Sequence, residues 1–352
     1  RSAARWSFRH AWPRVAAAPP RSGSGVPLKV LGCCPTEEEA ELRVWARASA
    51  FVPPFQARLV GFGQGSEEGA LVHLAVTHML SDGFSVVPLL EDLARLVARA
   101  EVGGAALTDL PPVPSPFALL EARLAETIAG DAPGVRGGIT REAVAGKSWH
   151  QAHCTFATLP AEAVAGMRRA ASGLAVPEDV VTLAAVGIAL AWLDGQERQA
   201  LAMIVPQRDG PGENDVVALL ADVRHLIVCT GGLSFAGVTL RLHHVVKERH
   251  WCAPGLATQY DLPLVNFEWT DLTERHGFVQ RVNPGGERAE SSLHPLRVSV
   301  DQPDREAWRL RVAFDRRRFG PCRRERFFEL LEAALRGLLE RPLDLVWPVE
   351  GC

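Results

Sequence analysis

One stretch decides how this chain folds, and it reads Val72-His73-Leu74-Ala75-Val76-Thr77-His78-Met79-Leu80-Ser81-Asp82-Gly83-Phe84-Ser85. From residue 70 to residue 78 one face collects Val72, Leu74, Val76 and His78, which is the period-2 pattern of a β-strand. A turn at residues 81–83 follows, and apolar positions then repeat at helical spacing over residues 86–97. The stretch predicts a strand-to-helix turn with His78 at the end of the strand.

Strands and helices alternate along the remainder of the sequence. Period-2 and short apolar patterns predict strands at residues 153–158, 201–205, 264–269, 296–300 and 308–314. Helical spacing predicts helices at residues 160–171, 179–193 and 327–338, of which the second is buried. Because single cores stop growing at roughly 250 to 300 residues, we expect 352 residues to form an α/β protein of two lobes, residues 1–148 and 149–352.

Composition and charge exclude several classes of protein. A hydrophobic content of 47% and a charged content of 22% are typical of a packed globular protein. The net charge of −3 gives no field that would gather nucleic acid or an anionic membrane, and the longest apolar stretch, residues 180–193, is shorter than the roughly 18 residues of a bilayer span. Arginine runs at residues 316–318 and 323–324 are local, and a solvated face is the simpler interpretation of them. We therefore expect neither nucleic acid nor membrane as a partner.

The cysteines and the start of the chain bear on its compartment. Seven cysteines is an odd number and no CxxC pair occurs, which favours a reduced compartment without structural zinc. No continuous apolar run follows the first residues, so they do not form a secretory signal. We expect a cytoplasmic protein, with an organelle-targeted parent chain as the alternative.

His78 is the candidate catalytic residue. An unprotonated imidazole can take a proton from an attacking amine, hydroxyl or thiol, provided that the ring is held in place. Asp82 and Gly83 allow the chain to turn sharply after the histidine, and a carboxylate locked to an arginine would fix that turn. The spacing His-x-x-x-Asp-Gly is short, and alone it is as compatible with coincidence as with a site.

Residues 72–85 resemble the HHxxxDGxS core of condensation domains of nonribosomal peptide synthetases, within the wider chloramphenicol-acetyltransferase-like superfamily. Other stretches resemble further elements of that family in the same order. They are residues 9–14 (RHAWPR), 54–59 (PFQARL), 179–196, 204–210 (IVPQRDG), 217–226 and 308–342. The resemblance covers nearly the whole chain except the first conserved element of the family, which suggests a truncated start.

The resemblance implies a fold and an activity. The expected fold is two chloramphenicol-acetyltransferase-like lobes in a V-shaped pseudo-dimer, with a central tunnel and His78 at its middle. The expected reaction is condensation-type acyl transfer, in which a carrier-bound acyl or peptidyl thioester forms an amide or ester with a carrier-bound acceptor. Expected partners are the donor and acceptor carrier domains and adjoining adenylation or ketosynthase modules. The domain itself binds no cofactor and no metal, because phosphopantetheine arms of the carriers deliver the substrates.

The same resemblance implies roles for individual residues. His78 would be catalytic, and Asp82 would be structural and paired with an arginine, Arg14 first and Arg9 second. Gly83 would be required by backbone geometry alone. Three further residues are candidates for substrate positioning, and they are Thr77, Ser81 and Asp222. Thr77 stands where the family has its first histidine, and Asp222 stands where many members have asparagine, so a plain turn role with Arg224 is equally compatible.

Three other functions remain open on the sequence alone. A free-standing acyltransferase that uses a soluble acyl-CoA needs the same histidine. A catalytically silent scaffold that docks carrier proteins is favoured by Thr77 and Asp222 and disfavoured by the retained His78. An epimerising variant of the family keeps the histidine motif, whereas a cyclising variant replaces it with an acidic one.

Overall fold

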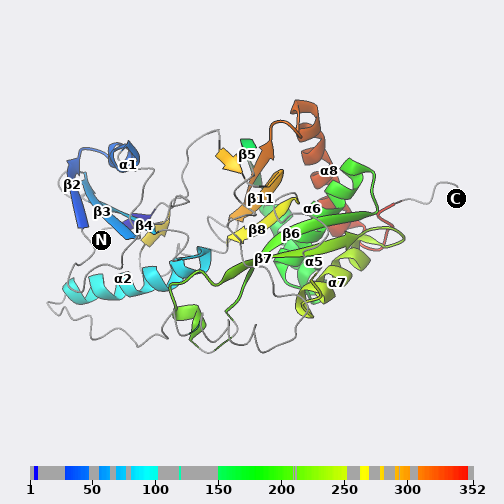
Figure 1. Cartoon of the computed structure of the whole chain (residues 1–352), viewed down its shortest axis with the longest axis horizontal. Coiled ribbons are helices and arrows are strands. Elements are labelled where there is room, and N and C mark those ends of the chain that lie inside the picture. The colour runs from blue at the N-terminus through cyan, green and yellow to red at the C-terminus, as the bar shows by residue number, and fades with distance from the viewer. Residues whose placement is uncertain are drawn as a thin grey trace, which may run out of the picture. The chain divides into compact units, whose positions relative to one another are not determined.

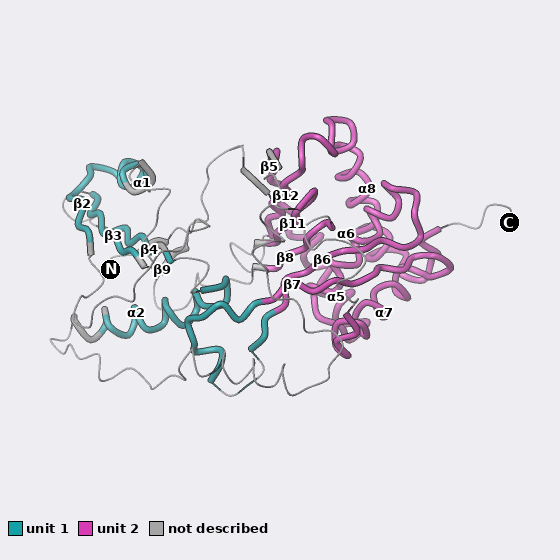
Figure 2. Tube along the Cα trace, viewed as in Figure 1, with its two compact units in different colours: residues 1–129, 206–221, 270–285 teal, residues 130–205, 222–269, 286–352 magenta. Residues whose placement is uncertain are grey.

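A computed structural model describes two compact units of the chain (Figure 2). Unit 1 comprises residues 1–129, 206–221 and 270–285, and unit 2 comprises residues 130–205, 222–269 and 286–352. The residues that the structure describes are 4–6, 28–46, 55–63, 69–76, 81–101, 119, 150–208, 210, 212–251, 262–268, 278–280, 290–292, 294–301 and 308–347. Each unit is built from three separate segments of the sequence. The sequence predicted two continuous lobes divided at residue 148.

Unit 1 contains a five-stranded sheet in the order β2-β3-β4-β1-β9 (Figure 1). The strands are β1 (Ala4–Trp6), β2 (Leu28–Cys34), β3 (Phe55–Phe62), β4 (Gly69–Val76) and β9 (Phe278–Gln280). β3 and β4 are antiparallel, and the other neighbours are parallel. Helix α1 (Glu37–Ala46) packs on the face that carries Val60 and Leu71, whereas α2 (Val86–Glu101) packs against Leu74. A helix therefore covers each face of this sheet.

The predicted strand-to-helix turn lies in unit 1. β4 ends at Val76, and residues 77–80, which include His78, lie outside the described part of the chain. Asp82 then caps the short helix η2 (Gly83–Ser85), and α2 begins at Val86. The prediction of a strand followed by a helix is confirmed for the described residues on both sides of His78.

Unit 2 contains a seven-stranded sheet in the order β10-β5-β12-β11-β8-β6-β7. The strands are β5 (His150–Leu159), β6 (Arg198–Pro206), β7 (Ala221–Cys229), β8 (Leu264–Glu268), β10 (Glu290–Ser292), β11 (Leu296–Asp301) and β12 (Trp308–Asp315). The helices are α5 (Ala161–Leu174), α6 (Glu178–Asp194), α7 (Phe235–Lys247) and α8 (Pro321–Glu340). Alternate residues of β6, β7, β8, β11 and β12 share one hydrophobic cluster with all four helices, so these helices cover one face of the sheet.

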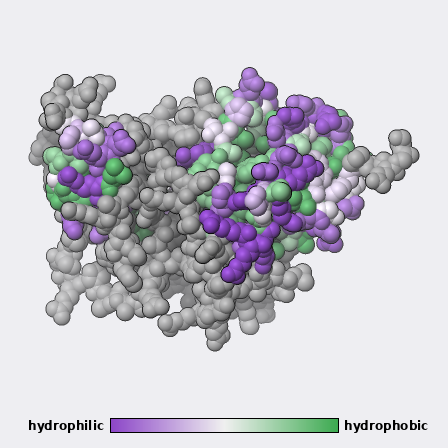
Figure 3. Space-filling model, turned by 90° about the horizontal axis from the view of Figure 1, so that it is seen from above, coloured by the Kyte–Doolittle hydropathy of each residue, from purple (hydrophilic) through white to green (hydrophobic). Residues whose placement is uncertain are grey.

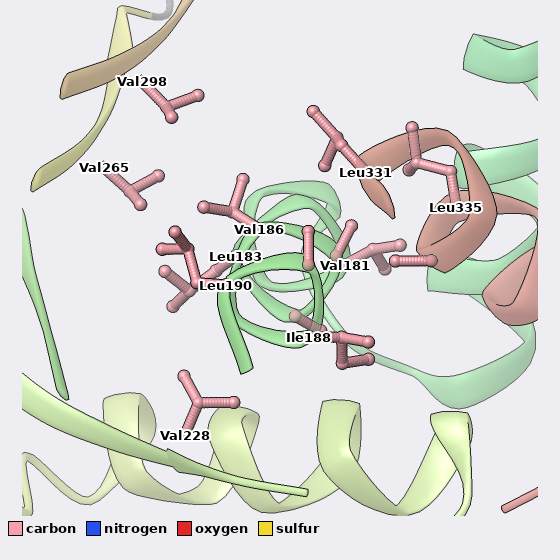
Figure 4. Packing of buried hydrophobic residues seen from close by; sticks show 14 of the residues in the cluster. Val181, Leu183, Val186, Ile188, Leu190, Val228, Val265, Val298, Leu331 and Leu335 are labelled. Atoms are coloured by element: carbon pink, nitrogen blue, oxygen red, sulfur yellow. The ribbon is translucent and has the colours of Figure 1, made fainter. Parts of the chain in front are cut away.

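Helix α6 forms the centre of this cluster because it is apolar on every side. Residues 180–191 are buried without exception, as expected for a helix whose sequence shows no polar stripe. Figure 4 shows α6 end-on, with Leu183 toward Val265 of the sheet and Val181 toward Leu331 of α8. Gly195 ends the helix in the left-handed conformation that favours glycine (φ 63°). The prediction of a buried helix at residues 179–193 is confirmed.

The described surface is mainly hydrophilic on the face drawn in Figure 3. Within the described residues, no single helix has both the length and the apolar composition to cross a bilayer. Helices α5 and α6 together have that length and composition, but the chain bends by 106° between them.

Candidate active site

Asp82 is held first by the helix that it caps. Its Oδ1 accepts hydrogen bonds from the backbone N–H of Ser85 (2.9 Å) and is 2.9 Å from the Ser85 hydroxyl. In return, the Asp82 N–H donates to Ser85 Oγ at 3.2 Å. This reciprocal pair is a capping box, which satisfies backbone groups that the first turn of a helix leaves without partners. The sequence Asp-Gly-Phe-Ser therefore fixes the Asp82 side chain at the start of η2.

The carboxylate of Asp82 has three further donors from the segment 206–221. Arg208 Nη2 donates to Oδ1 at 2.8 Å, and the backbone N–H groups of Leu220 and Ala221 donate to Oδ2 at 2.8 and 2.9 Å. The Asp82 side chain is only 1% exposed and that of Arg208 only 3%. A charge taken out of water is costly unless it is paired and hydrogen-bonded, and both conditions are met here.

Arg208 binds the segment 206–221 around the carboxylate. Its Nη1 donates to the carbonyls of Glu213 (2.6 Å) and Val216 (2.8 Å), and its Nη2 also donates to the Ala218 carbonyl (3.1 Å). The planar guanidinium can serve several acceptors at once because its N–H groups point in fixed directions. One buried side chain thus closes this loop of unit 1 on the turn that follows His78.

The described residues on both sides of His78 are anchored by different means. Val76 pairs with Phe55 in the β3–β4 ladder, and Asp82 is locked by the network around Arg208. The described residues on each side of positions 77–80 are thus held by hydrogen bonds.

Arg208 is the arginine that faces Asp82, and sequence reasoning assigned it no role. Arg14 and Arg9, which were expected there, lie outside the described residues, as do Thr77 and His78. A signal was present, because Arg208 lies in residues 204–210, one of the stretches that carry the family resemblance. Ser81 is half-buried and directly precedes Asp82, and its role in substrate positioning remains a prediction.

Gly83 does not adopt a backbone conformation that only glycine allows. The φ angle of Gly83 is not among those in the left-handed region. A Cβ at this position would meet none of the described atoms within 4 Å. Backbone geometry therefore does not require glycine here, and the expectation that it alone would do so is wrong.

Asp222 belongs to unit 2 and forms a local pair on β7. Its Oδ2 is 2.8 Å from Arg224 Nη2, and its Oδ1 accepts from the Val223 N–H at 2.8 Å. The pairing of Asp222 with Arg224 is confirmed, although it lies in a strand and not in a turn, whereas substrate positioning by Asp222 stays a prediction.

His225, on the same strand, was not singled out by the sequence. Its ring is buried, and its Nε2 has no hydrogen-bond partner among the described residues. Burial lowers the pKa of His225 from its usual value, against the nearby Asp222 carboxylate, which raises it. The lowered pKa favours the neutral form of this histidine in the folded chain.

Metal ligands do not gather in the described part of the chain. Among those residues no three His, Cys, Asp or Glu side chains come close enough together to hold an ion. Within the described residues, the Asp82 carboxylate is held by hydrogen bonds and by its ion pair with Arg208.

The fold is that of condensation domains from nonribosomal peptide and polyketide synthetases. The first condensation domain of the calcium-dependent antibiotic synthetase, solved with a substrate analogue, is 18% identical and superposes with a TM-score of 0.64 over 94% of this chain and 82% of that chain. The condensation domain that mediates chain release from the enacyloxin polyketide synthase is 17% identical, with a TM-score of 0.62 over 91% of this chain and 70% of that chain.

An epimerization domain shares the fold as well. The domain from the third module of tyrocidine synthetase B is 11% identical, with a TM-score of 0.62 over 90% of this chain and 80% of that chain. No family model matches the sequence, and no curated protein matches it. The similarity to known proteins is thus one of fold.

Proposed function

We propose that this chain performs condensation-type acyl transfer with His78 as its catalytic residue. The buried network of Asp82 and Arg208 carries the proposal, because it fixes the turn directly after His78 in a chain with the condensation-domain fold. Buried ion pairs often add little net stability, which makes a positioning role the better explanation of this one.

In the proposed reaction two carrier-bound substrates meet at His78. The acceptor amine attacks the carbonyl carbon of the donor thioester, a C–N bond forms, and the C–S bond breaks. His78 orients the amine and takes its proton, and this proton then passes to the departing thiolate, which leaves as the free thiol of the phosphopantetheine arm. A hydroxyl acceptor would give an ester by the same steps. A deprotonated amine is already a good nucleophile, so positioning contributes more than basicity.

The proposal is tested with purified carrier proteins. An acyl-loaded donor carrier and an aminoacyl-loaded acceptor carrier are mixed with the protein, and the acceptor-bound product is measured by mass spectrometry. We expect His78→Ala to lower the rate by about 10²- to 10⁴-fold and to leave residual activity, because general acid–base catalysis contributes about that factor. Equal rates for the wild-type protein and the variant would refute the assignment of His78.

A matched control is His244→Ala, which changes an exposed histidine on α7 of unit 2. This variant should keep the wild-type rate, and thermal melts of both variants should match that of the wild-type protein. Supplying free acyl-CoA in place of the donor carrier tests the rival free-standing acyltransferase. Product from acyl-CoA alone would replace the carrier-dependent proposal.

A further inference from the structure

A cluster of arginines projects from unit 2 where β12 turns into α8. Five of the 38 Lys and Arg residues of the chain fall within nine positions, Arg316, Arg317, Arg318, Arg323 and Arg324. The first four are exposed and the fifth is half-buried. We name these five side chains the arginine surface. The chain as a whole carries a net charge of −3, whereas residues 316–324 contain no acidic residue.

The backbone beneath the arginine surface is tightly held. Buried Asp315 accepts a hydrogen bond from the Arg317 N–H at its Oδ1 (3.0 Å), and its carbonyl accepts from the Arg318 and Phe319 N–H groups (3.1 and 2.9 Å). The buried Phe319 ring lies 5.3 Å from that of Phe314, and the Arg323 guanidinium lies 5.2 Å from the Phe319 centroid. The turn is therefore ordered before any partner binds, which lowers the entropy lost on binding.

Positive charge at this surface is only partly neutralised. Arg323 pairs with Asp194, and Arg318 lies 3.9 Å from the Asp315 carboxylate. Arg316, Arg317 and Arg324 have no carboxylate partner within the described residues. The first turn of α8 also contains no acidic residue, although the dipole of a helix favours acids at that end and disfavours arginines.

Arginines farther along α8 show the contrast. Arg326 pairs with Glu329, and Arg336 pairs with Glu332, each across one turn of the helix. Three arginines of α8 thus have a carboxylate partner, whereas Arg324 at its start and Arg316 and Arg317 in the preceding turn have none among the described residues. Like charges held together in this way repel one another, and an anionic partner would relieve that repulsion.

We propose that the arginine surface binds an acidic patch on a partner protein. Guanidinium groups match carboxylates with two parallel hydrogen bonds, and Arg316, Arg317 and Arg324, which have no carboxylate partner among the described residues, suit a cluster of Asp and Glu side chains. Nucleic acid fits less well, because the chain is acidic overall and the positive charge covers only nine residues. A membrane fits less well too, since none of the exposed large apolar side chains of the described residues lies within residues 316–324. This inference is independent of the acyl-transfer proposal.

The test measures binding of a fluorescein-labelled, glutamate-rich helical peptide by anisotropy, with a glutamine-rich version as the matched probe. The whole chain is compared with the triple variant Arg316→Ala, Arg317→Ala, Arg324→Ala. We expect the glutamate peptide to bind the wild-type protein and the triple variant to bind it roughly tenfold more weakly or worse, because three close charge pairs are lost. Raising the salt concentration to about 0.3 M should also weaken binding, since exposed charges are screened.

Arg336→Ala provides the control, because it removes one exposed arginine of α8 that already has a partner in Glu332. It should change the affinity by less than about twofold. The proposal is overturned if the glutamate peptide does not bind, if the glutamine peptide binds equally well, or if the triple variant binds like the wild-type protein. Tighter arginine-dependent binding of a DNA duplex or of anionic vesicles would also overturn it. A melting temperature of the triple variant at or above that of the wild-type protein would support it, since the substitutions relieve repulsion.

Discussion

The carboxylate of Asp82 lies within hydrogen-bond distance of five donors, two from Ser85 and three from the segment 206–221. Four of these donors require an acceptor oxygen at Asp82. The fifth, the Ser85 hydroxyl, can instead donate its single proton to the Ala218 carbonyl, which lies 2.9 Å away. An isosteric amide at this position would therefore bring an N–H₂ group against other donors. The charge of Arg208 would at the same time stay buried without a counter-charge.

We predict that Asp82→Asn lowers the free energy of unfolding by about 3–5 kcal/mol, because removing one member of a buried ion pair leaves the other uncompensated. Urea denaturation followed by circular dichroism measures the change. Asp222→Asn is the control, since this carboxylate is 33% exposed and pairs with a partly exposed Arg224. It should cost less than about 1 kcal/mol. Equal midpoints for the two variants would contradict the importance of the network.

At the residue scale, the sequence led to the structural role of Asp82 and its pairing with an arginine, but not to the arginine itself. Arg208 is 126 positions from Asp82, so no local spacing connects the two. The backbone N–H donors of Leu220 and Ala221 carry no side-chain signature at all, and they could not be predicted from composition or periodicity. The reason offered for Gly83 failed because a glycine in a family motif does not reveal which constraint keeps it.

At the element scale, patterns predicted the elements that contribute a regular face to the core of unit 2. Helix α6 and strands β6, β8, β11 and β12 lie within a few residues of their expected bounds. Shorter elements were missed, among them β10 and β9, whose three residues each are too few to show a period. Strand β7 was not predicted, because its polar start, Asp222 to His225, interrupts the alternation.

Replacing each of two helical glycines with alanine is expected to change the free energy of unfolding in opposite directions. A Cβ on Gly187 of α6 would lie 2.7 Å from Val228 Cγ2 and 2.9 Å from Val228 Cγ1, inside the buried core. A Cβ on Gly173 of α5 would meet nothing within 4 Å. Alanine is favoured over glycine within a helix by about 1 kcal/mol, and only Gly173 can gain from that preference without a clash.

We therefore expect Gly173→Ala to raise the free energy of unfolding by about 0.5–1 kcal/mol. Gly187→Ala should lower it by about 1–2 kcal/mol, since overpacking in a closely packed core costs more than the helical preference returns. Thermal or urea unfolding of both variants measures the signs. Adding Val228→Ala should reduce the loss caused by Gly187→Ala, and a loss that remains unchanged would contradict the proposed clash.

At the scale of the whole molecule, the interleaved units carry a prediction about separate fragments. A fragment of residues 1–129 contains Asp82 and Ser85 but lacks Arg208 and the N–H groups of Leu220 and Ala221. We expect this fragment to show no cooperative unfolding transition, because the carboxylate would lose three of its donors and α2 would lose its packing against the segment 206–221. Hydrogen exchange and urea denaturation of the isolated fragment check this.

Mixing the fragment with residues 130–352 supplies the missing segment and should restore protection in residues 81–101. Cooperative folding of residues 1–129 alone would show that the segment 206–221 is dispensable. The sequence indicated two lobes, but it did not indicate that residues 206–221 belong to unit 1 while the residues on both sides of them belong to unit 2. These sixteen residues have no composition that distinguishes them.

The bond between Asp82 and Arg208 also bears on how such proteins can be recombined. Consider two related proteins that differ in this contact. A chimera joined between residues 82 and 208 would combine residue 82 of one protein with the segment 206–221 of the other, so the contact could be lost. For the same reason we expect related sequences either to contain both Asp82 and Arg208 or to lack both. Exchange of segments between proteins of this fold should accordingly transfer residues 206–221 together with the turn at Asp82.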